Sequence, residues 1–135
     1  MTMEPLRPGD RVALLTSGGD APGMNAALRA AAKVGAALGL EMLGVDDGYR
    51  GLMEGRVRGM NLRALDDAAR RGGTILGSAR SKHFMTAEGR KQAQESIVGT
   101  RLSGLMILGG NGSLAGAQSL DGTLTHDGRP LRIVG

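Results

Sequence analysis

Cysteine and tryptophan are absent from this 135-residue sequence, which contains only one tyrosine, one phenylalanine and two histidines. A chain without cysteine forms no disulfide and offers neither a thiol nucleophile nor a cysteine zinc site, and two histidines argue against a histidine-rich metal site. Proteins that bind single-stranded nucleic acids stack the bases on aromatic rings, of which this chain has too few. We therefore expect no nucleic-acid partner, although the net charge of +4 favours partners that carry phosphate.

Long hydrophobic runs are also missing. No stretch approaches the ~18 apolar residues of a membrane-spanning helix, and the first residues lack the apolar core of a signal peptide. The sequence therefore predicts a cytoplasmic protein with no membrane partner, in which residues 1–10 form an N-terminal tail.

Glycine, in contrast, is abundant and fills 24 of the 135 positions. The glycines follow no three-residue period and there are only 4 prolines, which excludes a collagen-like chain. Apolar residues make up 41% of the chain and charged residues 22%, a balance that argues against disorder. We expect the chain to fold as one domain, with glycine required at particular turns.

Apolar runs and helical periodicity alternate along the chain. Short apolar runs predict buried strands, at 11–16, 41–45, 105–108 and 131–134, with a brief further strand at 74–76. Helical spacing predicts helices, at 24–38, 62–71, 86–98 (with Thr86 as its N-cap) and 113–120. Residues 46–60, which carry four glycines, are predicted to form a loop. This alternation predicts an α/β fold in residues 11–135, a Rossmann-like open and mostly parallel sheet with helices on both faces.

Two glycine-rich segments, 16–26 and 109–117, each join a predicted strand to a predicted helix. In this position, backbone N–H groups and the helix dipole attract an anion, and ligands of open parallel sheets bind beyond the carboxyl ends of the strands. Neither segment fits the Walker or the dinucleotide pattern. Two such segments in a basic chain indicate a polyphosphate site, with a purely structural turn as the alternative for each segment taken alone.

Four motifs occur in order: Ser17-Gly-Gly-Asp-Ala-Pro-Gly-Met-Asn-Ala26, Asp47-Gly-Tyr-Arg-Gly-Leu52, Gly72-Gly-Thr-Ile-Leu-Gly-Ser-Ala-Arg80 and Gly109-Gly-Asn-Gly-Ser-Leu-Ala-Gly-Ala117. Together they closely resemble the bacterial 6-phosphofructokinase family. The resemblance covers about residues 11–120 and the final predicted strand. It corresponds to the first part of a family chain more than twice this length, and implies that residues 11–135 form an incomplete N-terminal nucleotide-binding domain.

The resemblance implies transfer of the γ-phosphoryl group of ATP, accompanied by Mg²⁺, to the 1-hydroxyl of fructose 6-phosphate in glycolysis. Such chemistry depends mainly on positioning and on neutralisation of charge. A homotetramer is implied for the full-length family. The family's catalytic base lies in a Thr-Ile-Asp-Asn-Asp motif that would follow Gly135, so we expect the isolated chain to be inactive as a kinase.

The resemblance also assigns individual residues. Arg80 matches the family arginine that contacts the transferring phosphate, and Ser81 matches a neighbouring nucleotide contact; a solvated loop cation is the alternative for Arg80. Tyr49 matches a residue that lines the adenine region, with a packed core aromatic as the alternative. The full set that would contact the nucleotide is Gly19, Tyr49, Arg80, Ser81, Gly110, Asn111, Gly112 and Ser113.

Two of these positions bear on the phosphoryl donor and the metal. Relatives that use diphosphate usually carry an acidic residue at the position of Gly112, so glycine there favours ATP. At the position of Asn111 the family has an aspartate associated with magnesium. Because Mg²⁺ prefers anionic oxygen ligands, the neutral amide of Asn111 implies altered metal use or reduced activity.

Arg29 and Lys33 stand four residues apart on the first predicted helix, where like charges repel unless an anion lies between them. They resemble the basic pair with which the family binds an effector, ADP or phosphoenolpyruvate, although Lys33 is commonly arginine there. A solvated helix face is the alternative interpretation of the pair.

Two other functions are compatible with the sequence. A non-catalytic nucleotide-binding or regulatory remnant of the same family would keep the phosphate loops without the chemistry, and Asn111 favours it. A related Gly-Gly-Asp-Gly kinase, acting on a nicotinamide dinucleotide or a lipid, would share the fourth motif. The first and third motifs fit the sugar kinase better.

Overall fold

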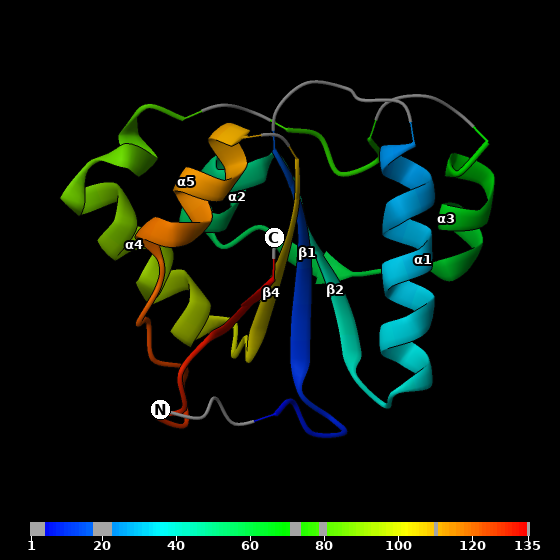
Figure 1. Ribbon diagram of the computed structural model, residues 1–135, viewed down its shortest axis with the longest axis horizontal. Helices are drawn as coiled ribbons and strands as arrows, with labels where there is room; N and C mark the ends of the chain where they lie inside the picture. Colours follow the sequence, from blue (N-terminus) through cyan, green and yellow to red (C-terminus); the bar gives the residue numbers. More distant parts are fainter. Residues whose placement is uncertain (1–4, 18–22, 71–73, 79–80, 110, 135) are drawn as a thin grey trace.

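A computed structural model describes residues 5–17, 23–70, 74–78, 81–109 and 111–134, with the backbone alone described for residues 111–114. Five strands form one sheet in the order β3-β2-β1-β4-β5, and the pairs β1–β2, β1–β4 and β4–β5 are parallel. Only β3, at the edge, runs antiparallel to its neighbour (Figure 1). The strands are β1 Arg11–Ser17, β2 Glu41–Val45, β3 Val57–Gly59, β4 Gly104–Gly109 and β5 Arg132–Val134.

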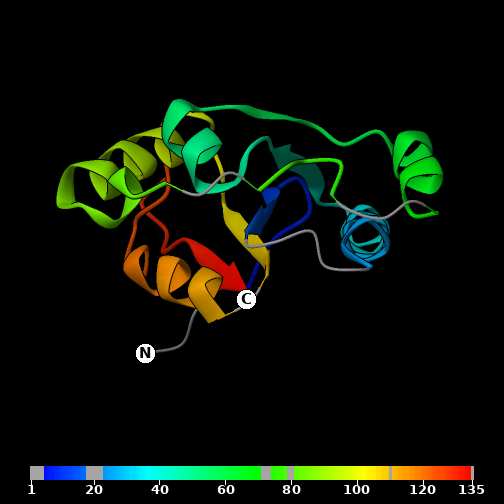
Figure 2. The same cartoon turned by 90° about the horizontal axis from the view of Figure 1, so that it is seen from above.

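Helices cover both faces of the sheet, as the sequence predicts (Figure 2). On one face lie α1 (Met24–Ala37) and α3 (Leu62–Ala68), which pack on Leu14 of β1. On the other face lie α2 (Gly48–Glu54), α4 (Ala87–Gly99) and α5 (Asn111–Ser119), which pack around Ala13 and Leu15. Because successive strand residues point to opposite faces, β1 supplies both cores at once.

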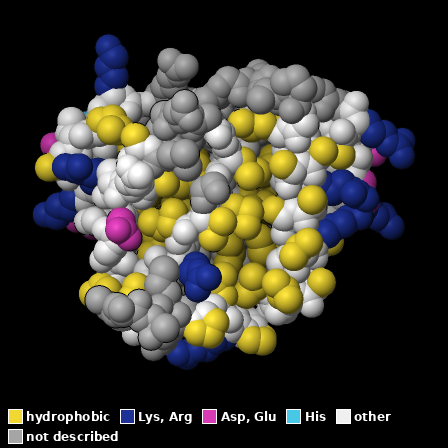
Figure 3. All heavy atoms as spheres, in the orientation of Figure 1, with side chains coloured by type: hydrophobic (Ala, Val, Ile, Leu, Met, Phe, Trp, Pro, Cys, Tyr) yellow, Lys and Arg dark blue, Asp and Glu magenta, His cyan; other side chains and the backbone are white. Residues whose placement is uncertain are grey.

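The face covered by α1 and α3 is only partly closed. Apolar side chains remain visible over the sheet between α1 and α5 (Figure 3), and Val134 of β5 is exposed. On β4, Met106 and Leu108 point to this face and are only partly buried, whereas Leu105 and Ile107 are buried in the opposite core. The sheet is therefore more deeply covered on the side of α2, α4 and α5.

Most predicted elements are confirmed within a few residues, but two are wrong. Residues 46–60 are not a plain loop, since they contain the short helix α2 and the edge strand β3. Residues 74–76 form a bend and not a strand. Helix α2 escapes the periodicity argument because glycines lie inside it, and Gly51 is required there: a Cβ at that position would lie 1.5 Å from the carbonyl oxygen of Asp46.

The predicted N-cap of α4 is confirmed. The Thr86 Oγ1 accepts a hydrogen bond from the backbone N–H of Gly89 at 3.0 Å, and Glu88 lies in the first turn, where the helix dipole favours a negative charge. The first turn of α4 also packs closely against η1 (His83–Met85), a short 3-10 helix. Only glycine fits at position 89, since a Cβ there would lie 2.0 Å from the carbonyl oxygen of His83.

The two aromatic side chains of the protein stack on each other in the larger core. The ring centroids of Tyr49 and Phe84 are 4.3 Å apart and the ring planes differ by 18°. Gly116 of α5 lies directly against the Tyr49 ring, since a Cβ there would be 2.7 Å from the Tyr49 Cζ. Burial raises the pKa of the Tyr49 phenol above its ordinary value. The stack thus joins α2, η1 and α5.

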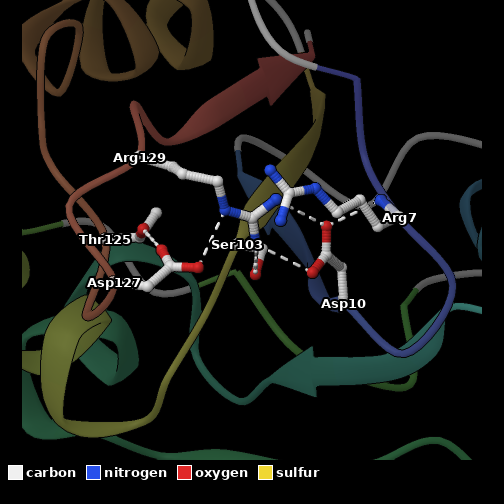
Figure 4. Close-up of polar contacts among 6 residues, drawn as sticks. All are labelled: Arg7, Asp10, Ser103, Thr125, Asp127 and Arg129. Carbon is white, nitrogen blue, oxygen red and sulfur yellow. Dashed lines mark hydrogen bonds and ion pairs between the residues drawn. The ribbon is translucent and has the colours of Figure 1, made fainter.

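A polar cluster lies at the edge of the sheet where the parallel strands begin, called the amino edge below (Figure 4). The Arg129 guanidinium donates to both carboxylate oxygens of Asp10, at 2.8 and 3.2 Å, and its Nε donates to Asp127 at 2.8 Å. The Arg7 backbone N–H also donates to Asp10, and a hydroxyl of Thr125 donates to Asp127. Arg129 and Asp10 are 15% and 12% exposed, so this pair is shielded better than an ordinary surface ion pair.

Replacement Gly116→Ala should lower the free energy of unfolding by about 1–3 kcal/mol, because the stacked Tyr49 ring has no room to move away from the new methyl group. Urea unfolding followed by tyrosine fluorescence reports the change directly, since Tyr49 is the only tyrosine and the chain has no tryptophan. Gly99→Ala, in a helix where a Cβ meets nothing within 4 Å, is the control and should be neutral or stabilising. Equal effects of the two substitutions would contradict the packing argument.

The Asp10 carboxylate should make stability depend on pH. Hydrogen bonds, first from Arg129 and then from Arg7, hold the pKa of Asp10 below its ordinary value despite partial desolvation. A carboxylate with a depressed pKa stabilises the fold above about pH 4, the range of the unfolded group, and this contribution is lost as the pH falls through the folded value.

Replacement Asp10→Asn should therefore cost about 1–3 kcal/mol at pH 7, and it should flatten the loss of stability as the pH falls below about 4. Urea unfolding at a series of pH values measures both effects. The exposed Asp121, in the same segment as Arg129, gives the matched control Asp121→Asn. A pH profile of Asp10→Asn that parallels that of the unmodified protein would rule out this role of the cluster.

Candidate functional site

The two glycine-rich segments begin side by side at the carboxyl edge of the sheet. Ser17, the last residue of β1, is the parallel partner of Gly109, the last residue of β4. Each strand leads to a helix, α1 after β1 and α5 after β4, and Gly23 precedes α1 with a left-handed φ of 88°. Two helix N-termini therefore lie at this edge, where their dipoles and N–H groups favour an anion.

The third motif lies across the same edge and is held there by Thr16, which is fully buried. The Thr16 Oγ1 lies 2.7 Å from the carbonyl oxygen of Gly77 and 3.0 Å from the Thr74 Oγ1. Thr16 has one hydroxyl proton, and the Gly77 carbonyl can only accept, so Thr74 donates to Thr16. Because Leu76 N–H in turn donates to Thr74 at 3.2 Å, a continuous chain of hydrogen bonds ties residues 74–77 to β1.

A second anchor comes from the first turn of α1. Asn25 is buried, and its Oδ1 accepts a hydrogen bond from the backbone N–H of Ile75 at 2.6 Å. Asn25 stands directly beside Met24, the first residue of the helix. The start of α1 and the third motif are therefore fixed relative to each other.

The second motif supplies a third anchor through Asp47. Its backbone N–H donates to the carbonyl oxygen of Leu76 at 2.8 Å, and its φ of 59° is unusual for a residue other than glycine. Gly77, with a φ of 76°, has no room for a Cβ, which would lie 2.9 Å from the Asp47 Oδ1. Arg56 holds the same carboxylate at 2.7 Å. All four motifs thus converge at one edge of the sheet.

Two of the predicted nucleotide contacts, Tyr49 and Ser81, have described side chains. Tyr49 is 7% exposed, and its stacking on Phe84 fits the alternative of a packed core aromatic. The Ser81 Oγ accepts a hydrogen bond from the backbone N–H of Phe84 at 3.3 Å and so holds the start of η1. Gly19, Arg80 and Gly110 lie outside the described residues. Asn111, Gly112 and Ser113 are placed by their backbone, in the first turn of α5.

The basic pair on α1 has an anion of its own chain beside it. The Asp66 Oδ1 on α3 lies 2.5 Å from the Arg29 Nε and 3.3 Å from the Lys33 Nζ. Hydrogen bonds, first from Arg29 and then from Lys33, lower the pKa of Asp66. Lys and Arg side chains gather on this side of the molecule, over α1 and α3 (Figure 3). The like charges that the sequence places four residues apart are therefore neutralised in part by α3.

Sequence reasoning missed the anchoring residues Thr16 and Asn25, although both stand within the first glycine-rich segment. A signal was present for Asn25, because an asparagine in the first turn of a buried helix needs a hydrogen-bond partner. Nothing in the sequence indicates that the partner is Ile75.

Within the described parts of the chain, no three His, Asp or Glu side chains gather in a way that could hold a metal ion. Asp20 and the side chain of Asn111 lie outside that description. Among the described helices, none combines the length and apolar character needed to cross a membrane.

Comparison with known proteins agrees with this arrangement. The chain is 47% identical over 110 residues to the ATP-dependent 6-phosphofructokinase of Clostridium tetani, covering 82% of this chain and 34% of the relative. It is 46% identical over 109 residues to the ATP-dependent 6-phosphofructokinase of Clostridium botulinum, covering 81% of this chain and 34% of that relative. The chain thus spans about a third of the length of these curated relatives.

Solved structures show the same fold. Phosphofructokinase from Saccharomyces cerevisiae superposes with a TM-score of 0.81 at 35% identity, over 93% of this chain and 19% of the other. A pyrophosphate-dependent phosphofructokinase from Marinobacter aquaeolei shares the fold alone, with a TM-score of 0.73 at 17% identity over 92% of this chain and 32% of the other. The family model described as phosphofructokinase matches residues 11–135. This chain therefore belongs to the phosphofructokinase family.

Proposed function

We propose that this chain is the nucleotide-binding part of an ATP-dependent 6-phosphofructokinase. The observation that carries the proposal is the parallel pairing of Ser17 with Gly109, because it sets two glycine-rich segments and two helix N-termini at one edge of the sheet. Phosphoryl transfer needs positioned donors around a polyphosphate, and such an edge provides them. The relatives named ATP-dependent 6-phosphofructokinase support ATP as the nucleotide.

In the complete protein, the reaction would move the γ-phosphoryl group of ATP to the 1-hydroxyl of fructose 6-phosphate. The contribution of this chain is to bind and orient the nucleotide: Gly19, Gly110 and Ser113 at the phosphates, Arg80 at the transferring group, with Ser81 beside it. Tyr49, which is 7% exposed and packed against Gly116, would support α5 from the core side and would not contact the adenine directly. A glycolytic enzyme of this kind would act in the cytoplasm, as a homotetramer in its full-length form.

Magnesium enters this proposal together with ATP, whose phosphate charge it would neutralise. Asn111, at the first position of α5, is the residue of this chain that the resemblance associates with the metal, and its amide oxygen is a weaker ligand than a carboxylate. The chemistry of this donor fits a metal held mainly by the nucleotide phosphates and by water. It does not fit a metal held tightly by the protein alone.

Arg29 and Lys33 are proposed to bind a phosphate-bearing effector, ADP or phosphoenolpyruvate. Both side chains are partly exposed, at 41% each, and both approach one carboxylate oxygen of Asp66. An effector phosphate would compete with Asp66 for the same two cations. The pair is thus already arranged around an anion.

Replacement Gly112→Asp should weaken ATP binding at least tenfold, a loss of about 1.4 kcal/mol, because it sets a negative charge beside the phosphates at the start of α5. Binding of diphosphate should weaken less, since it places no phosphate at that position. Isothermal titration of the 135-residue chain with ATP and with diphosphate measures the difference.

The matched control is Gly59→Asp, which adds the same charge on the exposed edge strand β3, where a Cβ meets nothing within 4 Å. It should leave both affinities unchanged. An unmodified chain that binds no ATP would refute the proposed function, whereas equal weakening by the two aspartates would refute only the role of Gly112.

Replacement Asn111→Asp should make ATP binding depend more strongly on magnesium, because a carboxylate gives the metal an anionic oxygen. Titrating ATP at a series of Mg²⁺ concentrations should show half-maximal enhancement at a several-fold lower concentration in the variant. An unchanged magnesium dependence would show that residue 111 does not face the metal.

A further inference from the structure

We infer that Thr16 is a positioning residue of the proposed nucleotide site, acting through the segment 74–77 that it holds against the carboxyl end of β1. The inference rests on the proposed function, since it concerns how that site is kept in shape. Thr16 is fully buried in a strand that otherwise presents apolar side chains to the core. A buried hydroxyl at this place carries a desolvation cost unless its hydrogen bonds are made.

The hydroxyl acts on a segment that has no strand or helix to hold it. Residues 74–78 are irregular, so side chains and loop contacts from other elements replace a regular hydrogen-bond ladder. Thr16 bonds both ends of the bend, through the Thr74 hydroxyl and the Gly77 carbonyl. Asn25 and Asp47 hold the middle, at Ile75 and Leu76. The hydrogen bonds of Thr16 link the bend to the strand from which the first glycine-rich segment departs.

Fixing Gly77 matters because the chain continues from it to Arg80 and Ser81, which the resemblance makes nucleotide contacts. Ser81 is itself tied to η1 through the N–H of Phe84. Gly77 is thus held by Thr16, and Ser81 is held by η1. Loss of the first anchor should displace the residue that meets the transferring phosphate more than those that meet the rest of the nucleotide.

The test is Thr16→Val, which keeps the shape of the side chain and removes only its hydroxyl. Thr16→Ser restores the hydroxyl. The matched control is Thr123→Val: Thr123 is also buried, and its hydroxyl also donates to a backbone carbonyl, that of Leu120 at 2.6 Å. It lies in the segment that pairs with Leu131 before β5, away from the carboxyl edge.

Three readouts on the 135-residue chain are compared: the Kd for ATP, the Kd for ADP, and hydrogen exchange of amides 75–77. Thr16→Val should raise the Kd for ATP about tenfold and the Kd for ADP less than about threefold, and should speed exchange at Leu76 and Gly77. Thr16→Ser should return all three readouts towards those of the unmodified chain. Thr123→Val should lower the melting temperature but leave both Kd values and this exchange unchanged.

Equal weakening of ATP and ADP in Thr16→Val, or unchanged exchange at amides 75–77, would overturn the inference while leaving the proposed function intact. The same conclusion follows if Thr123→Val matches Thr16→Val in the loss of ATP affinity. If the unmodified chain binds neither nucleotide, the proposed function fails, and this inference falls with it.

Discussion

The Thr16 hydroxyl lies within a hydrogen-bonded chain that runs from the Leu76 N–H through Thr74 to the carbonyl of Gly77. This chain joins the end of β1 to a segment more than fifty residues further along the sequence. Because β1 also pairs with β4 through Ser17, the same strand end fixes both glycine-rich segments and the bend that precedes Arg80. The geometry of the carboxyl edge depends on this junction.

The two edges of the sheet are held by different kinds of interaction. At the amino edge, Asp10, Arg129 and Asp127 form an ion-pair cluster whose charges satisfy one another (Figure 4). At the carboxyl edge, the described anchors are neutral side chains and backbone groups, with Asp47 turned toward Arg56. In the part of this edge that the structure describes, the Asp47 carboxylate is paired with Arg56, so the N–H groups and helix dipoles there are suited to a ligand that brings negative charge.

Hydrophobic periodicity predicts the elements well where apolar residues form the pattern, and poorly where glycines interrupt it. The strand at 41–45 and the helix capped by Thr86 follow from burial and capping alone. The sequence does not indicate helix α2, because its Gly51 reads as a helix breaker. The close contact of Gly51 with Asp46, which explains the glycine, is seen only in the folded chain. For the site, the motifs locate the two glycine-rich segments correctly at one edge, but a hydrogen bond from Ile75 to Asn25 joins residues whose proximity no local pattern encodes.

Nuclear magnetic resonance of the isotopically labelled chain, titrated with ATP and Mg²⁺, tests the central claim most directly. We expect saturable shifts of backbone amides at the carboxyl edge, at Ser17, Gly23, Gly77, Ser81 and Gly109. Amides of the opposite edge, such as Asp10 and Ser103, should stay in place. Shifts confined to that amino edge, or no shifts at millimolar ATP, would contradict the assignment of this edge as a nucleotide site.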